Sequence, residues 1–373
     1  YPVNVKPVSA TRARHDPQAG ARNLLINCAE VAPTDRVLIA YEPPQFGYFS
    51  PDILHEVTSA AEALGADVRT LDVGFSPAHT SLPAALMDQI AQTDVVIFLS
   101  RLGDQLRFSD LPVGPKYVVC FAFNGTLLGS AFSTAHYGAF CEVKAAVDAR
   151  IFAAREIRIT CPAGTDVTGA VTDGAHVPTD TTSRRFPMSI FSPVPAAGFS
   201  GQVALGGFLT GTGARYYDQY TLVFDGQVFA LLEAGRLVGF DGSAGDVARA
   251  EAHYTRVAAL FDLDRSFVHS WHAGIHPGCG FPWDMYAEDK RWGGSAFGNP
   301  RILHFHTCGA DPPGEISWNL FDPSIDVDGM RIWDQGLFHL ERLEGGPAIL
   351  AAYPCVAEVF AAPDRNIGFG DQT

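Results

Sequence analysis

Short apolar runs alternate with amphipathic segments over the first 155 residues of the chain. Four runs have the length of β-strands, with apolar residues that are continuous or alternate with polar ones: 36–40, 66–71, 94–100 and 117–121. Apolar residues at helical spacing predict helices over 51–64, 82–91 and 140–154, and Gly65 follows the first of these, where a helix is expected to end. Strands that alternate with helices predict a mostly parallel sheet with helices on its faces.

Beyond residue 155 the pattern changes to the alternation that is typical of half-buried strands. Four segments show it: 156–160, 202–205, 220–224 and 227–231. Asp225-Gly226 separates the last two segments and is typical of a two-residue hairpin turn, so we expect those two strands to pair. One helix is expected over 246–261, and the glycines of 206–213 predict β-turns. The sequence therefore predicts an α/β domain over 1–155 and a β-rich α+β domain over 156–373.

Composition and charge exclude several classes of protein. The chain has 373 residues, of which 47% are hydrophobic and 18% charged, as in a folded protein of about two domains. Its net charge of −15 argues against binding to nucleic acid or to an anionic membrane. No apolar run approaches the roughly 20 residues that a spanning helix needs, and the N-terminus has no apolar core of a secretory signal. Seven scattered cysteines without a Cys-x-x-Cys pair predict a reduced, cytoplasmic protein without a thiolate zinc site.

Several common enzyme motifs are absent from the sequence. No Gly-x-Gly-x-x-Gly fingerprint follows the first predicted strand, and the chain has no P-loop lysine motif. It also has no Gly-x-Ser-x-Gly nucleophile elbow and no His-Glu-x-x-His helix. These absences argue against a dinucleotide-binding enzyme, a serine hydrolase and a zincin.

The histidines are concentrated in one part of the chain, where five of the twelve fall between positions 269 and 306. His304 and His306 are two residues apart, so on a strand both imidazoles lie on the same face and can bind one metal ion. A third ligand is expected from the histidine-rich stretch 268–277. Three protein ligands leave open positions for substrate, as in a catalytic metal site.

The residues alone do not identify the third ligand. His269 and His272 are three residues apart and face opposite ways on a regular strand. His276 precedes a proline, which favours an extended or turn conformation. We expect one of these histidines to bind the metal and another to act as an acid, a base or a substrate contact.

Three further residues are candidates for the active site. His136 opens a predicted helix of the first domain and could face a cleft between the domains. Arg291 and Trp292 combine a cation and an aromatic ring in a glycine-rich loop, which could bind a carboxylate-bearing substrate. Each of the three could also have a purely structural role. Asp328-Gly329 predicts a turn rather than a calcium site, because no EF-hand spacing surrounds it.

Several segments resemble, in the same order, sequences of the thermophilic metallo-aminopeptidases of the aminopeptidase T type. They lie within residues 22–340 and include Gly164-Thr165-Asp166-Val167-Thr168 after a strand-like run. The other segments are 35–39, 64–68, 199–205 and 328–329. This family has a non-peptidase branch, the 2,5-dihydroxypyridine 5,6-dioxygenases, and the resemblance is greatest to that branch.

The resemblance implies a ligand set for the metal. The peptidases hold two metal ions with Glu, His, Tyr and a final His-x-Asp, whereas the dioxygenases hold one iron(II) with a histidine and the His-x-Asp pair. This chain has His304-Phe305-His306 at that pair, and no clear match for the carboxylates of the two-metal site. His269 matches the first histidine if one residue is inserted, and His272 is the alternative. The resulting all-histidine set is neutral, so a bound divalent ion would keep its full charge.

The leading hypothesis is an iron(II)-dependent ring-cleaving dioxygenase that acts on a small hydroxylated aromatic or N-heteroaromatic acid, with dioxygen as co-substrate. Its metal ligands are His269, His304 and His306, and His272, His276 and His136 are candidate acids or bases. The second hypothesis is a hydrolase in which zinc or manganese on the histidines activates a water molecule. The third is a small-molecule binding protein without a metal. The resemblance also implies a homo-oligomer.

Overall fold

The computed structural model describes residues 15–172 and 182–370. Its first sheet has five strands in the order β2-β1-β3-β4-β7, and all neighbouring strands are parallel. The strands are β1 (Arg36–Tyr41), β2 (Asp67–Asp72), β3 (Val95–Leu99), β4 (Lys116–Cys120) and β7 (Arg184–Phe186). The predicted parallel sheet is therefore confirmed, and one of its strands comes from beyond residue 155.

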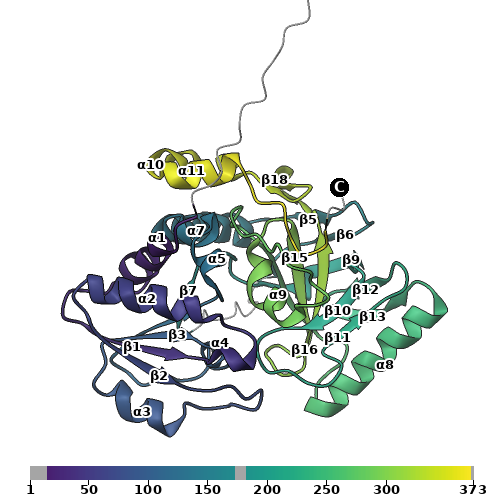
Figure 1. Ribbon diagram of the computed structural model, residues 1–373. Coiled ribbons are helices and arrows are strands. Elements are labelled where there is room, and N and C mark those ends of the chain that lie inside the picture. The colour runs from purple at the N-terminus through teal and green to yellow at the C-terminus, as the bar shows by residue number, and fades with distance from the viewer. Residues whose placement is uncertain (1–14, 173–181, 371–373) are drawn as a thin grey trace, which may run out of the picture.

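Helices cover both faces of this sheet. α1 (Pro17–Arg22) and α2 (Pro51–Ala63) lie on one face, and α3 (Ala84–Ile90) lies on the other (Figure 1). All five residues of β3 are buried because they pack against helices on both sides. This explains why the sequence of β3 is continuously apolar and does not alternate. α2 ends one residue before Leu64, and Gly65 has a φ of 84°, a left-handed conformation that glycine adopts readily.

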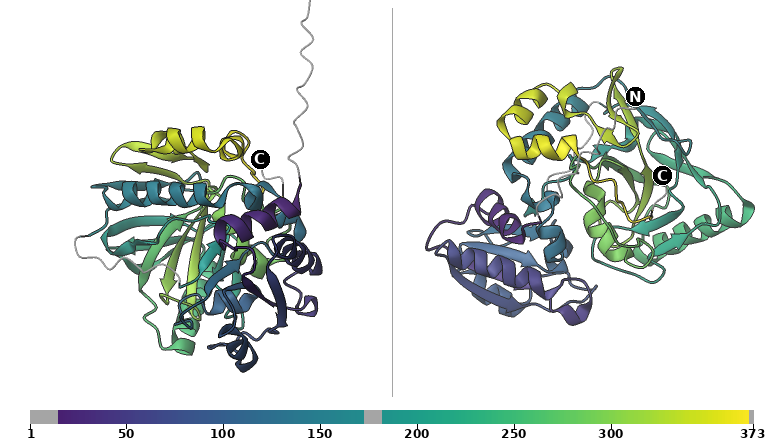
Figure 2. Two further views of the ribbon diagram at one scale, coloured as in Figure 1. Left: turned by 90° about the vertical axis from the view of Figure 1, so that its left-hand side faces the viewer. Right: turned by 45° about the horizontal axis from the view of Figure 1, so that its top comes forward.

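Two antiparallel sheets make up most of the remaining chain. The six-stranded sheet has the order β11-β10-β16-β15-β14-β8. Its strands are β8 (Val194–Pro195), β10 (Phe208–Gly211), β11 (Thr221–Val223), β14 (Val268–Ala273), β15 (Ile302–Cys308) and β16 (Glu315–Phe321). Figure 2 shows these sheets as a lobe beside the parallel sheet.

The eight-stranded sheet has the order β13-β12-β9-β6-β5-β17-β18-β19. Its strands are β5 (Ile157–Thr160), β6 (Asp166–Gly169), β9 (Phe199–Ala204), β12 (Phe229–Glu233), β13 (Arg236–Asp241), β17 (Ser324–Val327), β18 (Met330–Asp334) and β19 (Leu337–Phe338). Side chains from both antiparallel sheets form one apolar core, with α7 (Tyr137–Phe152) and α8 (Ala244–Phe261) packed against it. Trp271, Phe305 and Trp318 form a row on the core-facing side of the six-stranded sheet.

Most predicted elements are confirmed, but the hairpin around Asp225-Gly226 is wrong. β11 pairs with β10, whereas β12 pairs with β9 and β13 in the other sheet. The backbone N–H groups of Asp225 and Gly226 both donate to the carboxylate of Asp246, which holds the segment against α8. A tight turn does join the next two strands, β12 and β13, at Ala234 and Gly235, which both have positive φ.

One further prediction is wrong, and another stays a prediction. The segment 206–213, expected to form turns, contains β10. The domain boundary at 155/156 stays a prediction. Two observations bear on it: β7 belongs to the N-terminal sheet, and α7 packs on the core of the antiparallel sheets.

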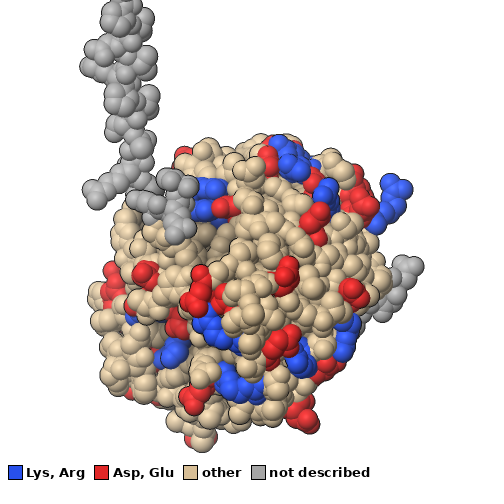
Figure 3. Space-filling view, turned by 90° about the vertical axis from the view of Figure 1, so that its right-hand side faces the viewer, with Lys and Arg blue, Asp and Glu red and all other residues tan. Residues whose placement is uncertain are grey.

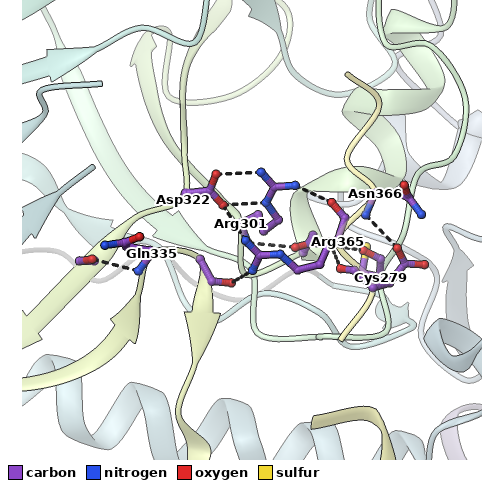
Figure 4. Close-up of polar contacts among 10 residues, drawn as sticks. Cys279, Arg301, Asp322, Gln335, Arg365 and Asn366 are labelled. Carbon is purple, nitrogen blue, oxygen red and sulfur yellow. Dashed lines mark hydrogen bonds and ion pairs between the residues drawn. The ribbon is translucent and has the colours of Figure 1, made fainter. Parts of the chain in front are cut away.

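The C-terminal segment is anchored on the second lobe by an ion-pair network around Asp322 (Figure 4). Arg301 donates two hydrogen bonds to its carboxylate, at 2.6 and 2.8 Å, and Arg365 donates one at 3.3 Å. Trp292 Nε1 donates to the carbonyl of Ile367 at 2.8 Å. These bonds hold the last described residues against α9 (Asp289–Ser295), which lies beside the cavity described below.

The surface shows no concentration of one charge on the face drawn in Figure 3, where acidic and basic side chains are interspersed. Among residues 15–172 and 182–370, no helix combines the length and the apolar character needed to cross a membrane.

Candidate metal centre

A cavity of about 710 Å³ lies between the parallel sheet and the six-stranded sheet. One wall is formed at the carboxyl ends of β3 and β4 and by β7, and includes Ser100, Phe121 and Arg185. The other wall is formed by β14 and β15. In an open parallel sheet, ligands bind at the carboxyl ends of the strands, so this cavity is at the expected position for a substrate.

Three histidines meet on the cavity wall. Nε2 of His272 lies 2.8 Å from Nε2 of His304 and 2.9 Å from Nε2 of His306. In the described part of the chain these three residues form a group whose ligand atoms all lie within 4.8 Å of one another. His272 and His304 are buried and His306 is nearly so.

Strand pairing explains how the histidines meet. His304 and His306 lie in β15, as the two-residue spacing predicted, and His272 of β14 stands directly opposite His304. Side chains alternate between the two faces of a sheet. The other face carries Trp271 and Phe305 in the apolar core, so the three imidazoles are left on the face that lines the cavity.

His269, predicted as the third ligand, does not belong to this group, and the predicted alternative, His272, takes its place. The pairing of β14 with β15 has an irregularity between Val268 and Ser270, which makes His269 the extra residue of a β-bulge. Its side chain still lines the cavity, with Nδ1 at 2.7 Å from Ser270 Oγ. The structure therefore reverses the predicted places of the two residues: His272 belongs to the cluster, and His269 lies beside it.

Hydrogen bonding alone does not satisfy the three imidazoles. Nδ1 of His272 lies 3.0 Å from the carbonyl oxygen of Phe191, so Nδ1 carries the ring proton and Nε2 presents a lone pair. That lone pair can accept one hydrogen bond, but two Nε2 atoms lie within 3 Å of it. Imidazole nitrogens bind metal ions at about 2.1 Å, so two of them at right angles on one ion are about 3 Å apart. The cluster therefore fits a metal ion.

The protonation states favour metal binding. Burial lowers the pKa of His272 and of His304 well below the ordinary value, and the neighbouring imidazoles and Arg185 lower both pKa values further. Burial also lowers the pKa of His306 to about 3. All three imidazoles are consequently neutral near pH 7, and neutral imidazole is the form that binds a metal.

Glu315, to which sequence reasoning assigned no role, supports the cluster. It begins β16, is buried, and places Oε1 at 2.7 Å from Nδ1 of His306. The hydroxyl of Thr212 donates to the same oxygen. Burial raises the pKa of Glu315 to about 8, and a bound cation would favour its charged form. A carboxylate in contact with a metal-binding histidine helps to fix the orientation of that ring.

His276, a candidate acid or base, is not part of the cavity wall. Its ring is fully buried, stacks on Phe140 at 3.7 Å and accepts a hydrogen bond from the backbone N–H of Gly278. Burial lowers its pKa to about 3. Its position is that of a neutral core residue, and the prediction of a catalytic role is not supported by this geometry.

The low pKa of His276 makes the stability of the protein depend on pH. The unfolded chain takes up a proton at this residue below about pH 6.5, whereas the folded protein does not until about pH 3, so stability decreases as the pH falls through this interval. At pH 5 we expect this residue to lower the free energy of unfolding by roughly 2 kcal/mol relative to pH 7.5.

Urea unfolding of His276→Asn and wild type at both pH values measures this effect. The variant is expected to be less stable at pH 7.5, because it loses the stacking on Phe140, but to lose about 2 kcal/mol less on acidification. His55→Asn, at an exposed position, is the control and should leave the pH dependence unchanged. If His276→Asn has the same pH dependence as wild type, the low pKa assigned to His276 is wrong.

The other three predicted residues also lie away from the cavity. His136 caps α7 by accepting from the N–H of Ala139 and packs against Tyr353. Arg291 donates to the carbonyl oxygen of Tyr48, and Trp292 is fully buried. None of the three lines the cavity, so the geometry does not support a catalytic or substrate-binding role for them.

Comparison with known proteins shows a shared fold. Neither a family model nor any curated protein sequence matches the chain. The structure is similar to that of 2,5-dihydroxypyridine dioxygenase from Pseudomonas putida, with a TM-score of 0.56 and 14% sequence identity over 86% of this chain and 95% of that chain. It also matches AmpT from Thermus thermophilus, with a TM-score of 0.49 and 12% identity over 86% and 98% of the two chains. The first likeness establishes a distant relationship of fold.

Proposed function

We propose that this protein is a mononuclear iron(II)-dependent ring-cleaving dioxygenase that acts on a small hydroxylated aromatic or N-heteroaromatic acid. The observation that carries the proposal is the convergence of three neutral imidazoles on the wall of a cavity large enough for such a substrate. The fold shared with a protein named as a 2,5-dihydroxypyridine dioxygenase adds support.

His272, His304 and His306 would hold the ion through their Nε2 atoms on the wall of the cavity. When bound, iron(II) supplies a site at which a substrate hydroxyl and dioxygen can be activated together. Phe297 stacks on His304 at 4.1 Å and covers one face of that ring. Phe121 and Phe191 offer apolar contacts for an aromatic ring in the same cavity.

His269 is the residue that we assign to proton transfer. It lines the cavity beside the cluster without belonging to it, and its side chain is partly exposed. Imidazole can accept and return a proton near neutral pH, which suits the deprotonation of a substrate hydroxyl. It is the extra residue of the bulge in β14, and its side chain lines the space that a substrate would fill.

His269→Ala tests this assignment. We expect the variant to bind a full equivalent of metal but to turn over substrate about 100-fold more slowly, the usual magnitude for loss of a general base. Metal content by mass spectrometry and oxygen uptake by electrode give the two readouts. Loss of metal from His269→Ala would contradict the assignment and indicate that His269 is a metal ligand.

The proposed function is tested by purification without oxygen, elemental analysis, and oxygen uptake with hydroxylated pyridines and benzoates. Stoichiometric iron together with substrate-dependent oxygen uptake supports it. The absence of uptake with every compound would contradict it.

A hydrolase is the second candidate, because three histidines are also the ligand set of catalytic zinc, which lowers the pKa of bound water to about 7. Here the carboxylate of Glu315 beside His306 is the specific observation in its favour. Zinc or manganese with turnover of amide substrates that is independent of oxygen would establish this candidate in place of the first.

A further inference from the structure

A row of three polar side chains crosses the six-stranded sheet at the histidine cluster. His304 of β15 stands directly opposite His272 of β14 on one side and directly opposite Asn319 of β16 on the other. Residues that stand opposite each other in an antiparallel pair lie on the same face of the sheet, with Cβ atoms about 4.5–5.5 Å apart. Asn319 is therefore the neighbour of His304 on the side away from His272, and it is not part of the cavity wall.

Asn319 and His304 each have a buried polar atom without a partner. Asn319 is fully buried, and His304 is only 2% exposed. Among the residues that the structure describes, Nδ2 of Asn319 and Nδ1 of His304 have no hydrogen-bond partner. A buried polar group without a partner costs about 1–3 kcal/mol, and here two such atoms belong to residues that stand opposite each other.

The amide oxygen of Asn319, in contrast, has a partner. The hydroxyl of Ser317 donates to Oδ1 of Asn319 at 2.9 Å, and Ser317 is itself fully buried. A hydroxyl can donate or accept, whereas the two ends of an amide have fixed roles, the oxygen as acceptor and the nitrogen as donor. Ser317 can therefore bond to either end of the amide, depending on which end is turned toward it.

Metal binding decides which end of the amide His304 needs. When Nε2 of His304 gives its lone pair to an ion, the neutral ring carries its proton on Nδ1 and becomes a donor there. While Oδ1 of Asn319 accepts from Ser317, the end of the amide that is left is a donor too, and two donors cannot bond to each other. A half turn of the amide, which keeps its shape, frees Oδ1 to accept from His304 and lets Nδ2 donate to the Ser317 hydroxyl.

We propose that Asn319 is a positioning residue of the metal centre, and that its amide oxygen accepts the Nδ1 proton of His304 when an ion is bound at Nε2. This bond fixes the tautomer and the orientation of the ring, as the outer partners of metal-binding histidines do. The proposal rests on the proposed function for the presence of a metal ion, but not for the identity of the metal or for the reaction. Asn319 would support His304 as Glu315 supports His306.

The test measures the zinc affinity of the chelator-treated protein by competition with a chromophoric chelator. Zinc binds to imidazole ligands more tightly than iron(II) does and undergoes no redox reaction. Asn319→Leu keeps the approximate size of the side chain but offers no acceptor, and it should lower zinc affinity by at least about tenfold. Asn319→Asp should bind zinc at least as tightly as wild type, because a carboxylate can accept from both His304 and Ser317. A purely structural role of the amide would not give this rescue.

Thr210→Val is the matched control. Thr210 is fully buried in β10 and stands opposite Ser317, so it lies on the same face of the sheet, one strand further from the histidines. Valine keeps its shape and removes a hydroxyl that lies 3.1 Å from Oγ1 of Thr221. This variant should be less stable than wild type but should bind zinc equally tightly. Unchanged affinity in Asn319→Leu, an equal loss in Thr210→Val, or an equal loss in Asn319→Asp would overturn the proposal.

A crystal structure of zinc-loaded wild type provides the test if Asn319→Leu does not fold. We expect the amide of Asn319 to lie within about 3.2 Å of Nδ1 of His304, and a distance above about 3.5 Å would overturn the proposal. Failure of wild type to bind zinc would overturn this proposal and the metal centre together. If zinc binds without any dependence on Asn319, only this proposal is wrong. If the dependence is found without oxygen uptake, Asn319 keeps its role and the dioxygenase is wrong.

Discussion

Replacement of His304 by alanine is expected to abolish stoichiometric metal binding and, with it, activity. His304 supplies one of three Nε2 atoms in the cluster, and the remaining two would hold an ion with much lower affinity. Loss of a residue that only supports a ligand lowers metal affinity by about 10–100-fold, so loss of a ligand should lower it by at least about 100-fold. Elemental analysis after dialysis, and thermal unfolding with and without added metal, measure the effect.

The thermal measurement separates ligand loss from misfolding. Saturation with a ligand at 100 times its dissociation constant stabilises a folded protein by about 2.7 kcal/mol, so wild type should unfold at a higher temperature when metal is added. His304→Ala should show no such increase. In chelator it should be modestly less stable than wild type, because it loses the stacking on Phe297.

His269→Ala is the matched control for this prediction. It removes an imidazole from the same cavity, but His269 is not in the cluster, so metal content and the metal-induced increase in melting temperature should both persist. Full metal content in His304→Ala, or its loss in His269→Ala, would contradict the geometry of the site.

Two of the three cluster histidines could be predicted from the sequence, and the third could not. Alternation along a strand is a local property, so His304-Phe305-His306 was enough to place two imidazoles on one face. The choice between His269 and His272 depends on the bulge in β14, which arises from the pairing of β14 with β15. No sequence pattern within residues 268–277 predicts how β14 pairs with β15.

The failed hairpin has a similar cause. Asp225-Gly226 has the local preference for a tight turn, but the strands on either side pair with partners in different sheets. The carboxylate of Asp246, about twenty residues later, accepts the N–H groups of both residues and fixes the segment. A contact over that separation is decided by the whole fold and overrides the local preference.

The position of Arg185 illustrates the same limit. The sequence places it in the predicted second domain, whereas the structure makes β7 the edge strand of the parallel sheet. That placement brings a basic residue from beyond residue 155 to the carboxyl ends of strands formed by earlier residues. Arg291, which a local pattern of cation, aromatic and glycine suggested, instead holds the carbonyl oxygen of Tyr48.

The role of Glu315 could not be predicted from the sequence either, because it depends on the pairing of β16 with β15. In β16 it lies two residues before Ser317, which stands opposite His306, so its side chain is on the same face as the cluster. Since that face carries His304 and His306, a carboxylate there is directed at a metal ligand. The contact of 2.7 Å with His306 Nδ1 leaves Nε2 of that ring to offer its lone pair to an ion.

Replacing Glu315 is therefore expected to weaken metal binding without removing a ligand. The all-histidine set carries no charge, so Glu315 is the nearest group that can balance a bound cation, and a cation favours its charged form. Glu315→Ala should lower metal affinity by about 100-fold and Glu315→Gln by about tenfold, because the amide keeps the contact with His306 but carries no charge. Competition with a chromophoric chelator gives both affinities.

Asp311→Asn is the control for Glu315→Gln, because it removes one negative charge from the same cavity at an exposed position. If Glu315 acts through its contact with His306, the control should bind metal as wild type does, and the order of affinity should be wild type, Glu315→Gln, Glu315→Ala. If Asp311→Asn weakens binding as much as Glu315→Gln, the effect is the general field of the cavity. Equal affinities for all four proteins would show that the His306 ring is oriented by its packing in β15 and does not need the carboxylate.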